Sequence, residues 1–206
     1  MSEGSLIAVA ERSPNRRTTG DRSLTSPAHS AGTDGLTTAP RALLLIDVAG
    51  SLRITRQLGD IEAYRLLKFL STSISQSPTM SGGRLVRSLG DGFLLEFDTV
   101  EGAIAHAVAA QRGVEELNPT DCSLKVRCGI HYGEVIEADG DVFGVAVYLA
   151  ARVCSHAHGG EILLTADARE AINGAPLPLN AFGPTLLPGF EEPVGLFELP
   201  WHDLPG

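Results

Sequence analysis

The order of strand-like and helix-like segments constrains the fold of this chain more than any other feature of its sequence. Short apolar runs bounded by polar residues or glycine predict strands, and longer segments with apolar residues at helical spacing predict helices. Interpreted in this way, the middle of the chain has the order strand, helix, strand, strand, helix, strand. The segments are 42–47, 54–77, 84–88, 93–97, 100–117 and 124–138.

This order is typical of an α+β fold with a ferredoxin-like βαββαβ core. A C-terminal extension follows, with a helix pattern at 145–157, a strand at 161–165, a short helix at 166–172 and a hairpin within 182–201. In the core, the strand–helix–strand crossover makes the first two strands parallel. The third strand then returns between them, so the turn that precedes it lies at the carboxyl end of the first strand.

Two acidic residues stand at that end of the sheet. The apolar run LLLID ends on Asp47, and the turn LGDG between the second and third strands contains Asp91. Carboxylates a few ångströms apart repel each other unless one is protonated or a cation binds both. Carboxylate oxygens suit Mg²⁺ or Mn²⁺, which usually bind substrate phosphates as well.

The glycine that follows Asp47 supports a phosphate ligand. Gly50 and Ser51 come at the start of the first predicted helix, where backbone N–H groups can approach phosphate oxygens. Strand-ending aspartates and GDG turns are each common, so the prediction depends on their convergence at one edge. Together they indicate a metal-assisted reaction on a nucleoside triphosphate.

The composition indicates a soluble globular protein with one domain and an N-terminal tail. The chain has 206 residues, 43% of them hydrophobic, and its net charge of −9 disfavours a nucleic-acid surface. No signal peptide or membrane-spanning pattern is present, and three cysteines without CxxC spacing fit a reducing cytosol. We expect a disordered tail at 1–40, a folded domain at 41–206 and a cytoplasmic location.

Five motifs in succession resemble those of the class III nucleotidyl cyclases. They are LLLIDVAGSLRITRQLGD, GGRLVRSLGDGFLLEF, LKVRCGIHYGEV, DVFGVAVYLAARVCSHAHGGEILLT and LPGFEEPVGLFELPW. The resemblance covers 41 to about 201 and implies that 41–206 is a cyclase catalytic domain. It also implies an activity, the conversion of a nucleoside triphosphate into a 3′,5′-cyclic nucleotide and diphosphate.

The resemblance assigns catalytic roles to particular residues. Asp47 and Asp91, with the Val48 carbonyl, would hold two divalent ions, Mn²⁺ or Mg²⁺, which activate the ribose 3′-hydroxyl for attack on the α-phosphorus. Arg152, in LAARV, stands where the family has an arginine that neutralises charge on the α-phosphate in the transition state.

The resemblance also implies phosphate contacts and a second subunit. The backbone groups of Gly50, Ser51 and Leu52 would hold the β- and γ-phosphates. In the family, the metal-binding acids come from one subunit and the base-reading and transition-state residues from the other. We therefore expect a head-to-tail homodimer with its active sites at the interface, and a separate effector that reads the cyclic product.

Two positions depart from the adenylate cyclase pattern. Arg87 stands in place of the usual lysine and Tyr148 in place of the asparagine that orients the ribose, whereas Asp141 keeps the acid of the base-reading pair. Arg87 only donates hydrogen bonds and ionised Asp141 only accepts them, so the pair can read adenine, cytosine or uracil, and guanine fits less well. Both replacements are larger than the usual residues, and a smaller pocket favours a pyrimidine.

A pyrimidine is therefore narrowly favoured as the substrate base, and adenine is the close alternative. With UTP or CTP as substrate, the chain would resemble the stand-alone pyrimidine cyclases of Pycsar antiphage defence, which make cyclic UMP or cyclic CMP. With ATP it would be an adenylate cyclase. A hypothesis of another class is an inactive nucleotide-binding regulatory module, because Tyr148 replaces a ribose-orienting residue; the retained acids and Arg152 count against it.

Overall fold

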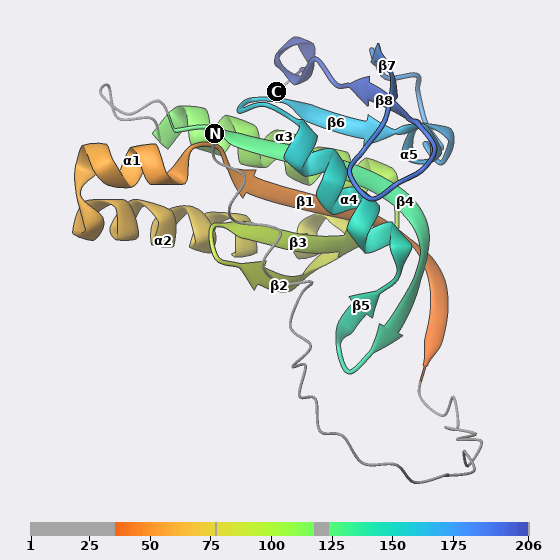
Figure 1. Cartoon of the computed structure of the whole chain (residues 1–206), viewed down its shortest axis with the longest axis horizontal. Coiled ribbons are helices and arrows are strands. Elements are labelled where there is room, and N and C mark those ends of the chain that lie inside the picture. The colour runs from red at the N-terminus through yellow and green to blue at the C-terminus, as the bar shows by residue number, and fades with distance from the viewer. Residues whose placement is uncertain (1–35, 77, 118–123, 206) are drawn as a thin grey trace, which may run out of the picture.

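Residues 36–76, 78–117 and 124–205 are described by the structure, a computed structural model (Figure 1). The strands are β1 (Thr37–Val48), β2 (Gly83–Leu89), β3 (Gly92–Phe97), β4 (Val126–Ala138), β5 (Asp141–Phe143), β6 (Ile162–Thr165), β7 (Asn180–Thr185) and β8 (Val194–Glu198). The helices are α1 (Ser51–Leu58), α2 (Asp60–Gln76), α3 (Val100–Leu117), α4 (Val145–His156) and α5 (Ala166–Glu170), with short 3₁₀ helices η2 (Pro78–Ser81) and η3 (Trp201–Asp203). None of the described helices is both long and apolar enough to cross a membrane.

The strands form one mixed sheet in the order β2-β3-β1-β4-β6-β8-β7, with β5 paired to β4. β3 is antiparallel to both β1 and β2, so these two strands run parallel with β3 between them. The order confirms the predicted α+β fold with its ferredoxin-like core. Strands β6, β7 and β8 extend the sheet beyond β4, and β7 and β8 form the predicted terminal hairpin.

The central strand β1 is covered on both faces, which explains its continuous apolar run. Ala42, Leu44 and Ile46 pack into the larger buried cluster, to which α1, α2 and α3 contribute. Leu43 and Leu45 pack into a second cluster on the other face, beneath α4 (Figure 1). The part of a strand that is buried on both faces does not alternate apolar with polar residues, so 42–46 are all apolar.

The structure differs from the prediction in two boundaries and in one strand that was missed. β1 begins at Thr37, so the predicted tail overlaps the sheet at 37–40, and the rest of that tail, up to residue 35, lies outside the described residues. The single helix predicted at 54–77 is two helices that meet at Gly59, whose φ of 80° and ψ of 161° are not helical. β5 was not predicted, because three residues are too short to show a periodic pattern.

Candidate active site

The register of β1 against β3 brings the two predicted acids together. Asp47 pairs with Gly92, and Asp91 immediately precedes Gly92 in the turn from β2 to β3. The carboxylates are close enough that the charge of Asp91 contributes to a raised pKa of Asp47. The sequence argument from topology therefore placed both acids at the correct edge of the sheet.

Asp47 is buried and has a positively charged neighbour. Only 2% of the residue is exposed, and this burial is the main cause that raises its pKa. Arg127, opposite Asp47 on β4, donates from Nε and Nη2 to Asp47 Oδ2 at 2.9 and 2.6 Å, which acts in the other direction and lowers the pKa. Arg127 Nη1 donates to the carbonyl oxygen of Ser155, near the end of α4, at 3.0 Å.

Arg127 was not among the predicted site residues. Its signal in the sequence is a charged side chain between Val126 and Cys128, both of which are fully buried in β4. A charge at such a position requires a counter-charge nearby. That reasoning could have paired Arg127 with a buried acid, but it could not have identified Asp47 without the strand register.

The surroundings of Asp47 fit a divalent ion. Its Oδ1 is buried and has no hydrogen-bond partner among the described residues. A Cβ placed on Gly92 would lie 3.3 Å from this oxygen, so glycine keeps the space beside it open. Groups of three or more potential side-chain ligands are absent from the described residues. A metal here would therefore take its other ligands from backbone carbonyls, such as that of Val48, from water or from a substrate.

The segment after β1 leads directly into the N-terminus of α1. Gly50 adopts a left-handed conformation, with φ of 73° and ψ of 33°, and directly precedes α1. The first N–H groups of a helix have no intrahelical acceptor, and here they belong to Ser51 and Leu52. The first turn of α1 carries no acidic side chain that would repel an anion. All three predicted phosphate-binding residues thus stand at the start of α1.

The predicted base-reading residues contact each other. Arg87 on β2 donates from Nε and Nη2 to Asp141 Oδ1 at 3.1 and 2.6 Å, and from Nη2 to the carbonyl of Val142 at 3.2 Å. The guanidinium carbon of Arg87 lies 5.7 Å from the ring centroid of Phe143, which is 51% exposed. The arginine and the acid are therefore paired with each other and partly accessible.

The two predicted residues on α4 differ in their exposure. Tyr148 is 57% exposed, and Arg152, one helical turn later, is half-buried. Within the described part of the chain, no ion pair joins Arg152 to Asp47 or Asp91. The ion pairs within the described part of one chain therefore do not link Arg152 to the acids.

Known proteins are similar to this chain in sequence and in fold. The family described as "Adenylate and Guanylate cyclase catalytic domain" matches residues 38–197. An uncharacterized protein of Mycobacterium tuberculosis is 33% identical over 159 residues, which are 77% of this chain and 40% of that protein. An adenylate cyclase of Streptomyces coelicolor is 34% identical over 135 residues, 65% of this chain and 35% of that protein.

The chain thus spans about two fifths of the length of these curated relatives. Among solved structures, the adenylyl cyclase CyaB from P. aeruginosa superposes with a TM-score of 0.71 at 19% identity, over 79% of this chain and 94% of that one. That structure supports the fold, whereas the family match extends over the strands and loops that carry the two acids, Arg87, Asp141 and Arg152. The chain belongs to the adenylate and guanylate cyclase catalytic-domain family, the class III nucleotidyl cyclases.

Proposed function

We propose that this chain converts a nucleoside triphosphate into a 3′,5′-cyclic nucleotide and diphosphate. The ribose 3′-oxygen forms a bond to the α-phosphorus, the bond from that phosphorus to the bridging oxygen of the β-phosphate breaks, and the hydroxyl proton is released. The observation that carries the proposal is the pairing of Asp47 with the Asp91 turn in a chain of this family. Asp47 Oδ1 has no hydrogen-bond partner among the residues that the structure describes, which leaves it available to a cation.

Asp47 and Asp91, with the Val48 carbonyl, would hold two divalent ions, Mn²⁺ or Mg²⁺. When bound, such ions stabilise charge on the attacking and departing oxygens. The protein residues have separate tasks: Arg127 keeps one oxygen of Asp47 fixed, and Gly92 leaves the other oxygen accessible to a ligand. The N–H groups at the start of α1 would bind the terminal phosphates, since they lack intrahelical acceptors.

A second copy of the chain would complete the site in a head-to-tail homodimer. Arg152 and Tyr148 lie on α4, and no ion pair within the described residues joins Arg152 to the acids, so we assign these two side chains to the site of the partner. Large apolar side chains gather nearby, with Phe143 51%, Val145 69% and Tyr148 57% exposed. Exposed apolar groups of this size at one place are typical of a surface that another molecule covers.

The Arg87–Asp141 pair would select the base. An arginine and a tyrosine where relatives use smaller side chains reduce the available space, which favours UTP or CTP, and a separate effector would read the cyclic pyrimidine nucleotide, as in antiphage defence. ATP is the second candidate, favoured by the similarity to proteins named adenylate cyclase. The inactive regulatory module is the candidate of another class, and Tyr148 at the ribose position favours it.

A turnover assay with all four triphosphates tests the proposal. Purified protein with Mn²⁺ is incubated separately with UTP, CTP, ATP and GTP, and the products are identified by mass spectrometry. We expect one cyclic nucleotide to dominate. Asp91→Ala should lower turnover by ~10³-fold or more, since it removes a ligand of the metal centre. Asp98→Ala is the matched control, because its carboxylate is 76% exposed and lies at the other end of β3. No product from any of the four would leave the regulatory module as the interpretation.

A further inference from the structure

A β-bulge in β2 places two arginines on the same face of the sheet. Arg84 is opposite Glu96 on β3 and Arg87 is opposite Leu94, with the register shift between Leu85 and Arg87. Residues three apart on a regular strand point to opposite faces. The extra residue in β2 removes this difference, because Glu96 and Leu94 are two apart on β3 and share a face. Both arginines therefore point toward the hairpin formed by β4 and β5.

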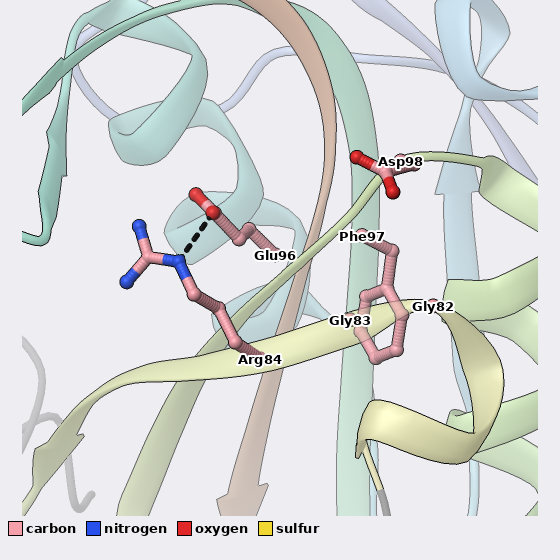
Figure 2. Close-up of a pocket in the computed structure, with 6 residues that line it drawn as sticks. All are labelled: Gly82, Gly83, Arg84, Glu96, Phe97 and Asp98. Atoms are coloured by element: carbon pink, nitrogen blue, oxygen red, sulfur yellow. Dashed lines mark hydrogen bonds and ion pairs between the residues drawn. The ribbon is translucent and has the colours of Figure 1, made fainter.

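Arg84 links a buried acid to the tip of this hairpin. Its Nε donates to Glu96 Oε1 at 2.6 Å, and its Nη1 donates to the carbonyl oxygen of Gly140 at 2.6 Å. Figure 2 shows Arg84 and Glu96 facing each other beside an open cavity of about 260 Å³. The Glu96 side chain is only 10% exposed, whereas that of Arg84 is 40% exposed. The buried partner fixes the guanidinium, and the more exposed arginine reaches the hairpin.

The two arginines hold three consecutive residues of the hairpin. Arg84 binds Gly140, and Arg87 binds the side chain of Asp141 and the carbonyl of Val142. These contacts differ in one respect. Arg87 and Asp141 pair through the same groups that would bind the base, so their mutual pairing competes with a ligand. Within the hairpin, Arg84 contacts only the carbonyl oxygen of Gly140, the residue before Asp141, and can keep this contact while a nucleotide is bound.

We infer that Arg84, oriented by Glu96, is a positioning residue that sets base selectivity by fixing the hairpin tip. This inference rests on the proposed function, since it assigns base reading to Arg87 and Asp141. Asp141 adjoins the anchored Gly140, whose φ is 77°, and the preceding Asp139 also has a positive φ, of 51°. In such a tight turn, the backbone position of Gly140 determines the position of Asp141. If the hairpin tip were mobile, Asp141 could accept hydrogen bonds from bases whose donor groups are placed differently.

Two variants of the anchor test this inference. Arg84→Lys keeps a positive charge beside Glu96 but loses the planar fork that serves two acceptors at once. The double variant Arg84→Ala/Glu96→Ala removes both charges, so no buried carboxylate is left unpaired and the fold is protected. Arg65→Lys is the matched control, because Arg65 pairs with exposed Glu62 on the surface of α2.

The readouts are base selectivity and hydrogen exchange of the hairpin. For both anchor variants, we expect the ratio of kcat/KM between the best and the second-best triphosphate to fall about tenfold, mainly through KM. Amide exchange in 134–143 should accelerate. Arg65→Lys should change neither. An unchanged ratio in a folded anchor variant would overturn the role in selectivity, and unchanged exchange would overturn the anchor itself.

The exchange measurement separates this inference from the proposed function. If the wild-type protein converts none of the four triphosphates, the proposed function fails, and with it the role in selectivity. The anchor is still tested by hydrogen exchange, which needs no turnover. Slow exchange in 134–143 that both variants retain would then show that Arg84 does not hold the hairpin.

Discussion

Buried histidines on both sides of the sheet couple protein stability to pH at the scale of single residues. His106 on α3 is 3% exposed, and its Nε2 has no partner among the described residues. Burial lowers its pKa below the ordinary value of 6.5, against the smaller opposing effect of the Ile74 backbone, which acts as a hydrogen-bond acceptor for the ring. Burial also lowers the pKa of His131. Both rings are therefore neutral in the folded protein at pH values where the unfolded chain is protonated.

The sign of the pH effect follows from this difference. Below pH 6.5 the unfolded chain binds a proton at His106 that the folded state does not, so the free energy of unfolding falls by at most ~1.4 kcal/mol per pH unit for this residue. We expect His106→Leu to flatten the dependence between pH 7 and pH 5, as measured by urea unfolding. His158→Leu is the control, since that side chain is 81% exposed. Equal slopes for wild type and His106→Leu would show that the ring is not a neutral buried group.

Residue chemistry also decided how much of the site could be predicted. Asp47 and Asp91 could be placed together because acidic residues at these positions of the fold carry a chemical meaning, whereas Arg87 was assigned through the resemblance to the cyclase family. Arg127 and Arg84 could not be placed in this way, because an arginine in a strand has many possible partners. Their partners are 80 and 12 positions away in the sequence, and only the sheet register and the bulge determine these pairings.

At the scale of elements, α4 packs so closely on β4 that a glycine is required. A Cβ on Gly129 would lie 2.2 Å from the backbone nitrogen of Cys154. Because the obstacle is helix backbone, α4 would have to move, and it carries both Tyr148 and Arg152. The position of these two side chains therefore depends on a residue that contacts no substrate.

We expect Gly129→Ala to lower both stability and turnover. Overpacking of this kind costs ~1–3 kcal/mol in unfolding free energy. Urea unfolding gives the stability, and cyclic-nucleotide production gives the activity. Gly113→Ala on α3 is the matched control, because an added Cβ meets nothing within 4 Å there and alanine favours a helix by ~0.5–1 kcal/mol. If Gly129→Ala matches the wild type in both measurements, the close packing of α4 is not required.

The elements themselves were predictable where their patterns were long. The two-sided burial of β1 and the helical spacing in α3 were visible in the sequence. The division between α1 and α2 was missed because apolar spacing continues across Gly59, whose backbone conformation ends the first helix. β5 and the bulge in β2 were missed because each depends on pairing with another strand. Such pairing cannot be inferred from a local sequence pattern.

At the scale of the whole molecule, the proposed dimer makes a quantitative prediction. Asp91→Ala and Arg152→Ala should each be inactive alone, since each removes a group from every site. When the two variants are mixed and allowed to exchange subunits, half of the dimers are mixed, and each mixed dimer has one intact site. Activity should return to about a quarter of the wild-type level. The four-triphosphate assay measures it, with each variant alone at the same total concentration as control.

A mixture that stays inactive despite subunit exchange, confirmed by differently tagged copies, would contradict shared active sites. Recovery would in turn locate Arg152 opposite the acids of the partner. The overall topology was predictable from the order of segments, because the crossover rule leaves few arrangements. The formation of a dimer depends instead on how two surfaces fit together. Exposed residues such as Phe143 and Val145 indicate a contact surface but do not specify which surface binds to it.

The pairing of Arg127 with Asp47 has a consequence for the stability of the protein when no cation is bound. A buried carboxylate without a counter-charge destabilises a fold, because its charge is desolvated. Here the guanidinium of Arg127 supplies a counter-charge from within the sheet. If the proposed metal ions bind at Asp47, their removal should therefore abolish turnover without unfolding the protein.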